Sequence, residues 1–227
     1  MLEIQNLKKK YGDDGIEDID VTLEEGIIYA VIGPNGVGKT TLLETVAGLL
    51  RPSEGQILLN DMSPLLRETK KYIGFALESD SCYPEMKLGD LLEFVYMQKY
   101  DDMGRDEIQE YLDRYELSDS RNKYYHTMST GMKKKTGIIM TFMGNPDLVL
   151  LDEPTNGVDT TGIIHIKEDM MTAKKRGAIV VVSSHELDFL TKVADVCFFM
   201  KNGRFVKKVS VSEEENLEDI YKEIYLS

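Results

Sequence analysis

The sequence predicts an α/β fold whose main sheet is mostly parallel. Short, continuous apolar runs recur along the chain, and stretches with helical periodicity separate them. Runs without polar alternation are typical of strands buried on both faces, as in a parallel sheet between layers of helices. A third observation, a long helical stretch in the middle of the chain, predicts a helical subdomain inserted into this core.

Each element can be placed along the chain. In the first sixty residues, turn signals containing glycine separate three short strands, which predicts an antiparallel β subdomain over 2–7, 16–23 and 56–59. The expected strands of the main sheet are 27–32, 148–151, 178–182 and 196–200. A helix is expected at 40–47, directly after the first of these strands, and another over 217–225 at the end of the chain.

The helical stretch sets the expected subdivision of the chain. Apolar residues from Leu88 to Tyr96 recur at helical spacing, and a second such set follows the acidic pair Asp106-Glu107. We expect one domain over 1–227, with its α/β core in 1–77 and 145–227 and its helical subdomain in 78–144.

Composition excludes several classes of protein. The 27 basic and 40 acidic residues give a net charge of −13, which argues against binding nucleic acid by neutralising phosphates. The two cysteines, Cys82 and Cys197, form no CxxC pair, so a disulfide scaffold or a zinc module is not expected. No apolar run approaches the roughly 18 residues of a membrane helix, and we expect a cytoplasmic chain.

A phosphate-binding motif follows the strand at 27–32. Residues 33–40 read GPNGVGKT, which fits GxxxxGK[ST], with a predicted strand before it and a helix after it. Glycines let successive backbone N–H groups point at phosphate oxygens, and the next helix directs its N-terminal dipole at the same anion. Lys39 supplies positive charge to the β- and γ-phosphates, and Thr40 a hydroxyl ligand to Mg²⁺. The nucleotide-binding residues expected here are Asn35, Gly36, Gly38, Lys39, Thr40 and Thr41.

An acidic pair ends the strand at 148–151. Asp152 and Glu153 follow it, and carboxylates at the carboxyl edge of a buried strand lie where α/β folds place their chemistry. Asp152 is expected to hold Mg²⁺, and Glu153 to act as the base that polarises a water toward the γ-phosphate. His185 comes after the strand at 178–182, so it is expected at the same edge, donating a hydrogen bond to the γ-phosphate.

Taken in order, these segments resemble the nucleotide-binding subunit of ATP-binding cassette (ABC) proteins, whose core is a P-loop NTPase fold. The resemblance covers nearly the whole chain and is specific because order and spacing both match. Its motifs are Tyr11, GPNGVGKTT at 33–41, MSTGM at 128–132, LVLLDEP at 148–154, NGVD at 156–159 and His185.

The resemblance implies an ATPase that uses ATP and Mg²⁺ and acts as a pair of subunits. It implies that Tyr11 stacks on adenine. Ser129 and Gly131 would cap the γ-phosphate of ATP bound to a second copy, or to a related cassette, and Asp159 would link the two sites. The neighbouring lysines 133–135 are expected on a solvated helix face near phosphate, and not as a nucleic-acid patch.

Two departures from the family pattern stand out. Thr130 and Met132 replace a glycine and a glutamine of the usual signature, so fewer polar contacts to phosphate are expected. Glu78 stands where the family commonly has glutamine, and its carboxylate is a third candidate Mg²⁺ ligand. We predict that Glu78 increases dependence on Mg²⁺; unchanged Mg²⁺ dependence of ATP turnover in Glu78→Gln would refute this.

The expected function is that of the ATP-hydrolysing subunit of a transporter. Both departures and the tail helix resemble a subgroup of exporters, so we expect export through a permease on another chain, with this subunit on the inner face of the membrane. The permease is expected to dock around 78–86, where Tyr83, Pro84 and Met86 lie in a predicted loop.

The alternative is a membrane-independent cassette ATPase, such as an iron–sulfur assembly protein. A P-loop kinase does not account for the signature segment.

Overall fold

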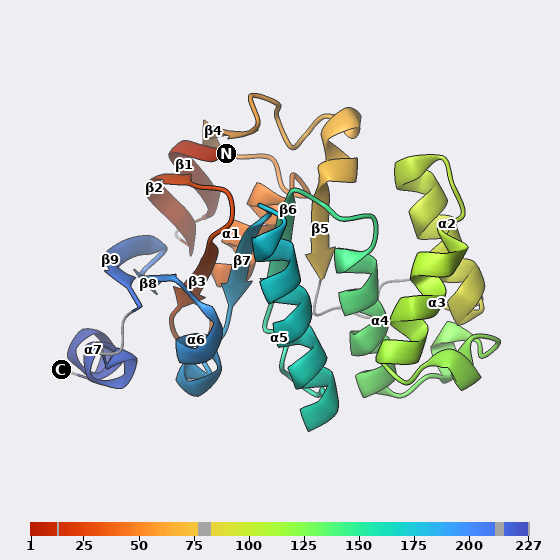
Figure 1. Ribbon diagram of the computed structural model, residues 1–227. Helices are drawn as coiled ribbons and strands as arrows, with labels where there is room; N and C mark the ends of the chain where they lie inside the picture. Colours follow the sequence, from red (N-terminus) through yellow and green to blue (C-terminus); the bar gives the residue numbers. More distant parts are fainter. Residues whose placement is uncertain (13, 77–82, 212–215, 227) are drawn as a thin grey trace.

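The computed structural model describes residues 1–12, 14–76, 83–211 and 216–226, and it contains a six-stranded sheet in the order β5-β6-β7-β3-β8-β9 (Figure 1). The first five of these strands are parallel, and β9 is antiparallel to β8. The prediction of a mostly parallel main sheet is therefore confirmed. The strands are β3 (Ile28–Ile32), β5 (Ile73–Ala76), β6 (Leu148–Asp152), β7 (Ile179–Ser183), β8 (Val196–Lys201) and β9 (Arg204–Ser210).

The N-terminal residues form a separate sheet. Strands β1 (Leu2–Tyr11), β2 (Asp14–Leu23) and β4 (Glu54–Leu59) pair in the order β2-β1-β4, and both pairings are antiparallel. This confirms the predicted antiparallel subdomain. β1 is longer than predicted, because it continues to Tyr11 beside the start of β2.

Two apolar cores lie on opposite faces of the six-stranded sheet. Along β3, Ile28, Ala30 and Ile32 belong to the core shared with the helices, whereas Tyr29 and Val31 belong to the core under the antiparallel sheet. All five side chains are buried. A strand that alternates between two cores has no polar face, which explains its continuous apolar sequence.

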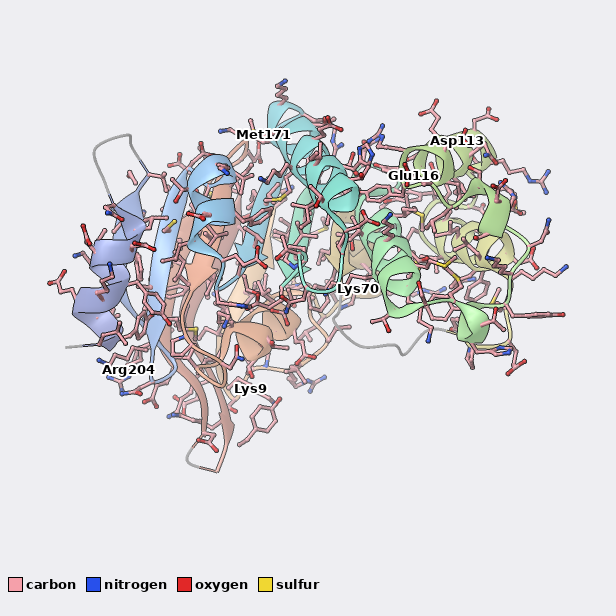
Figure 2. All side chains as sticks on the ribbon, turned by 90° about the horizontal axis from the view of Figure 1, so that it is seen from below. Lys9, Lys70, Asp113, Glu116, Met171 and Arg204 are labelled. Atoms are coloured by element: carbon pink, nitrogen blue, oxygen red, sulfur yellow. The ribbon has the colours of Figure 1, made fainter. Side chains whose placement is uncertain are left out.

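The helices surround this sheet. Figure 1 shows α2 and α3 at the end of the molecule away from β1 and β2, with α4 between them and the sheet. Figure 2 shows Asp113 and Glu116 at this end, whereas Lys9 and Arg204 lie at the opposite side. None of the helices in the described ranges is both long and apolar enough to span a membrane. The helices are α1 (Lys39–Val46), α2 (Leu88–Tyr100), α3 (Arg105–Arg114), α4 (Thr130–Phe142), α5 (Thr160–Lys175), α6 (Leu187–Val193) and α7 (Leu217–Tyr225), and three 3-10 turns lie at Arg67–Tyr72, Ser118–Ser120 and Tyr125–Thr127.

A buried carboxylate connects α3 with α5. Asp169 on α5 is 3% exposed and accepts hydrogen bonds from the Tyr115 hydroxyl, at 2.7 Å, and from the Arg114 guanidinium. Burial raises the pKa of Asp169, against the opposing effect of these two donors. The Tyr115 and Arg114 donors therefore offset the cost of burying this carboxylate between the helices.

We predict that Tyr115→Phe lowers the free energy of unfolding by about 1–3 kcal/mol, because it leaves a buried carboxylate oxygen without its donor. Urea denaturation measures this change. Tyr124→Phe is the matched control, since Tyr124 is 47% exposed and its hydroxyl forms no hydrogen bond with the described residues. Equal unfolding midpoints for the two variants would contradict the prediction.

Candidate functional site

The phosphate-binding motif forms the loop between β3 and α1. Gly36 and Gly38 have φ values of +79° and +107°, in the left-handed region that favours glycine. A Cβ on Gly38 would also lie 2.7 Å from Ile16 Cγ2, so no larger residue fits there. α1 begins at Lys39 without a side-chain cap, which leaves its first N–H groups without intrahelical acceptors. This end of the helix is suited to an anion.

Interactions at both ends hold α1 in place. At its C-terminal end, the Lys70 ammonium donates hydrogen bonds of 2.7 and 2.8 Å to the carbonyls of Ala47 and Gly48. At its N-terminal end, the Lys39 side chain is 6% exposed, and its Nζ donates to the carbonyls of Gly33, at 2.8 Å, and Pro34, at 3.3 Å. The Lys39 charge is therefore held under the loop that carries the motif.

The register of the sheet assembles an oxygen-rich cluster beside this loop. Asp152 ends β6 directly opposite Ser183 on β7, and Ser183 is paired with Val31 of β3. One Asp152 carboxylate oxygen accepts a hydrogen bond of 2.6 Å from the Thr40 hydroxyl, and the other accepts one from Ser183. Hydroxyl and carboxylate oxygens are the ligands that Mg²⁺ prefers, so this donor set fits Mg²⁺. Our sequence reasoning did not single out Ser183, although it directly follows a predicted strand.

Glu153 has an uncommon backbone dihedral angle, and its two carboxylate oxygens have different neighbours. Its φ of +44° is rare for a residue other than glycine, and the residue is 7% exposed. Oε2 lies 2.9 Å from His185 Nδ1, whereas Oε1 has no hydrogen-bond partner among the described residues and lies 3.5 Å from Lys39 Nζ. The imidazole thus orients one carboxylate oxygen and leaves the other able to accept a proton.

A cavity of about 510 Å³ brings most of the predicted residues together. Tyr11 contributes a half-exposed ring at its rim, with Lys9 Nζ 5.0 Å from the ring centre. The cavity is lined by Tyr11, Asp14, Gly15, Asn35, Gly36, Gly38, Lys39, Thr40, Thr41, Asp152, Glu153, Asn156 and His185. Of the other predicted residues, Glu78 lies outside the described residues.

Ser129, Gly131 and Asp159 do not line this cavity, but lie close to one another elsewhere. Ser129 caps α4 by accepting a hydrogen bond of 3.3 Å from the backbone N–H of Met132. A Cβ on Gly131 would lie 3.1 Å from the Gly157 carbonyl oxygen, so α4 begins directly against the turn that leads to Asp159. These residues form a second surface, separate from the phosphate loop of the same chain.

An ion pair joins the helices at this second surface. Lys135 Nζ lies 2.7 Å from Asp159, which also caps α5 by accepting the Gly162 N–H at 2.7 Å. The hydrogen bond from Lys135 lowers the pKa of Asp159. Lys135 itself is only 7% exposed. The expectation of a solvated lysine face is therefore wrong for Lys135, because the start of α5 covers it.

Comparisons with known proteins agree with this geometry. The family described as "ABC transporter" matches residues 16–156. The lantibiotic transport ATP-binding protein SrtF of Streptococcus pyogenes is 32% identical over 222 residues, which are 97% of this chain and 96% of that protein. A solved ATP-binding subunit of an ABC transporter has a TM-score of 0.90 and 26% identity, with 98% of each chain covered.

A second solved structure is similar in fold. It is a dimer of the ATP-binding cassette MJ0796 in a post-hydrolysis state, bound to ADP and Pi. Its TM-score is 0.85 at 22% identity, over 93% of this chain and 99% of that one.

Proposed function

Because the chain belongs to the ABC transporter family, we propose that it is the ATP-hydrolysing subunit of a transporter, with ATP and Mg²⁺ bound in the cavity beside the phosphate loop. One observation carries the proposal. A buried carboxylate pair, Asp152 and Glu153, converges with Lys39 and Thr40 from the other side of the same cavity.

Different residues of the cavity bind the phosphates, the adenine and Mg²⁺. The phosphate loop, Lys39 and Thr41 bind the β- and γ-phosphates, and the Tyr11 ring stacks on adenine. Thr40 and Asp152 are the residues that would hold Mg²⁺. When bound, Mg²⁺ neutralises phosphate charge and fixes the orientation of the β- and γ-oxygens. The Ser183 hydroxyl keeps the Asp152 carboxylate in position by donating to its second oxygen.

Glu153 is the proposed general base. Its Oε1, which has no hydrogen-bond partner among the described residues, accepts the proton of the water that attacks the γ-phosphorus. As the water oxygen bonds to the γ-phosphorus, the bond between this phosphorus and the bridging oxygen breaks, and ADP is the leaving group. Oε2 stays bonded to His185, which holds the carboxylate in one rotamer. The half-exposed imidazole also reaches toward solvent. Its other nitrogen donates to the γ-phosphate in the imidazolium form, which carries a proton on both ring nitrogens.

The ATP site is completed by a second subunit. Ser129 and Gly131 stand at the start of α4, where a hydroxyl and free N–H groups suit a phosphate, but they lie outside the cavity of their own chain. We infer that they cap the γ-phosphate in a neighbouring cassette, either an identical chain or a relative, and that Asp159 contacts the opposite site. Each chain then contributes to both sites of the pair.

The proposed membrane partner is a permease on another chain, and the proposed direction is export. The docking region is expected around 78–86, of which 78–82 lie outside the described residues. Within the described part, Tyr83 is 56% exposed and its ring packs edge-on against Phe94, with centroids 5.3 Å apart. The relative SrtF is named as a lantibiotic transport protein, which supports a role in transport. This docking places the subunit on the inner face of the membrane.

We predict that the Glu153→Gln chain, tagged and expressed in its own host, co-purifies with a multi-span membrane protein when membranes are solubilised with ATP and Mg²⁺. The substitution stops turnover and so favours the ATP-bound state. Identification of the captured chains by mass spectrometry checks this, and Lys39→Ala is the control that loses ATP. Recovery of soluble partners only, with the bait absent from membranes, would favour the membrane-independent cassette.

A further inference from the structure

The C-terminal helix packs beside the phosphate loop. α7 begins at Leu217, which is 2% exposed, and Lys201 Nζ donates a hydrogen bond of 2.6 Å to the Ile224 carbonyl near its end. Tyr221 and Tyr225 project from it as a pair, with ring centroids 4.5 Å apart. A second cavity, of about 760 Å³, is lined by both tyrosines and by Asn35 of the phosphate loop. The helix is therefore a neighbour of the loop, although it is distant in sequence.

The Tyr225 hydroxyl lies between the ends of two strands. Its oxygen is 3.1 Å from the carbonyl oxygen of Ile32, the last residue of β3, and 2.8 Å from that of Met200 on β8. Met200 lies where the pairing of β8 with β9 shifts register. The Tyr225 hydroxyl supplies a side-chain donor to the backbone carbonyls at this irregularity. Burial raises the pKa of Tyr225 to about 12, so the hydroxyl remains a donor at physiological pH.

This contact lies where the phosphate loop begins. Gly33 follows Ile32 directly, and a Cβ on it would lie 2.7 Å from the Met200 carbonyl oxygen and 3.3 Å from the Tyr225 hydroxyl oxygen. The Gly33 carbonyl in turn accepts a hydrogen bond of 2.8 Å from Lys39 Nζ. The two ends of the loop are thus connected to α7 through adjacent contacts.

We propose that Tyr225 is a positioning residue for nucleotide binding, through which α7 holds the first residues of the phosphate loop in the conformation that receives phosphate. The single hydroxyl proton is shared between the Met200 and Ile32 carbonyls, so the hydroxyl holds the end of β3 beside β8 and orients the backbone at Gly33. Preorganised N–H groups bind an anion without first losing conformational freedom. The inference rests on the proposed nucleotide site and extends it to a segment that lies outside the cavity.

The test compares two tyrosine variants of the full chain. Tyr225→Phe removes the hydroxyl and keeps the ring, and Tyr221→Phe makes the same change on a hydroxyl that forms no hydrogen bond with the described residues. Calorimetric titration with ADP and Mg²⁺, a product complex that avoids turnover, gives Kd for each. We expect Kd to rise about three- to tenfold in Tyr225→Phe and to stay unchanged in Tyr221→Phe. Equal Kd values would overturn the proposal, even if Tyr225→Phe melts at a lower temperature.

A second measurement separates loop positioning from loss of stability. Hydrogen exchange followed by mass spectrometry is expected to show faster exchange in the peptide that covers 33–39 of Tyr225→Phe. Faster exchange confined to α7 would assign the tyrosine a structural role only. If the wild-type chain does not bind ADP, the proposed site itself fails; if it binds ADP and Tyr225→Phe binds equally well, only this inference fails.

Discussion

Replacement of Glu153 by glutamine is expected to reduce ATP turnover by about 10²- to 10⁴-fold, the usual contribution of a general base. The amide keeps the shape of the side chain and the contact with His185, but it cannot accept a proton. Oε1 of Glu153, which has no hydrogen-bond partner among the described residues, is the atom that this change alters chemically. ATP binding is expected to persist, because the phosphate loop, Lys39 and Thr40 are untouched. The measurement is single-turnover hydrolysis of ATP by the subunit with its partners.

Glu186→Gln is the matched control for this prediction. It makes the same change one residue after His185, on an exposed side chain that does not line the cavity. It is expected to retain wild-type turnover. Turnover in Glu153→Gln within a few-fold of this control would remove Glu153 from the role of base.

Lys39→Ala is expected to have the second large effect, which is a loss of affinity for ATP. The ammonium is buried beside the loop, 3.5 Å from Glu153 Oε1, and Lys39 is the only lysine or arginine among the described residues that line the cavity. Loss of a charge-assisted contact to phosphate costs about 1.5–3 kcal/mol, which corresponds to a rise in the Kd for ATP of about 10- to 100-fold. Calorimetric titration with ATP in the Glu153→Gln background measures Kd without turnover.

This variant has a second consequence. In the chain that retains Glu153, Lys39→Ala leaves this carboxylate buried without its cation, so the unliganded single variant is also expected to melt at a lower temperature than the wild type. Lys192→Ala, which removes an exposed lysine of α6, controls for the loss of one positive charge. An ATP affinity in Lys39→Ala equal to that of Lys192→Ala would contradict the proposed phosphate site.

Local sequence patterns were sufficient for the fold class and for one side of the cavity, although β5 (Ile73–Ala76) was not among the expected strands. The apolar run at 27–32 predicted β3, which is observed at Ile28–Ile32. The motif at 33–40 predicted a loop between this strand and a helix, and α1 begins at Lys39. The position of Asp152 at a strand end predicted the edge of the sheet at which it is found. In each case the signal lies within a dozen neighbouring residues, where backbone preference and burial pattern act together.

Contacts between distant segments were not predictable in this way. Ser183 supports Asp152 only because β6 and β7 are neighbours in a register that pairs these two residues. Lys135 is buried because α5 begins beside α4, and its own sequence neighbours are lysines typical of a surface. Tyr225 reaches the Ile32 carbonyl across 193 positions. Such details depend on how the elements pack, and no local pattern encodes that packing.

The central claim is that this chain holds ATP in the cavity between the phosphate loop and the Asp152–Glu153 pair. It is tested most directly by photolabelling with an azidoadenine analogue of ATP, followed by identification of the labelled peptide by mass spectrometry. We predict labelling of the peptide that carries Tyr11, protection by excess ATP, and loss of labelling in Lys39→Ala. ATP-protected labelling of a peptide remote from this cavity, or labelling of Lys39→Ala equal to that of the wild type, would contradict the account.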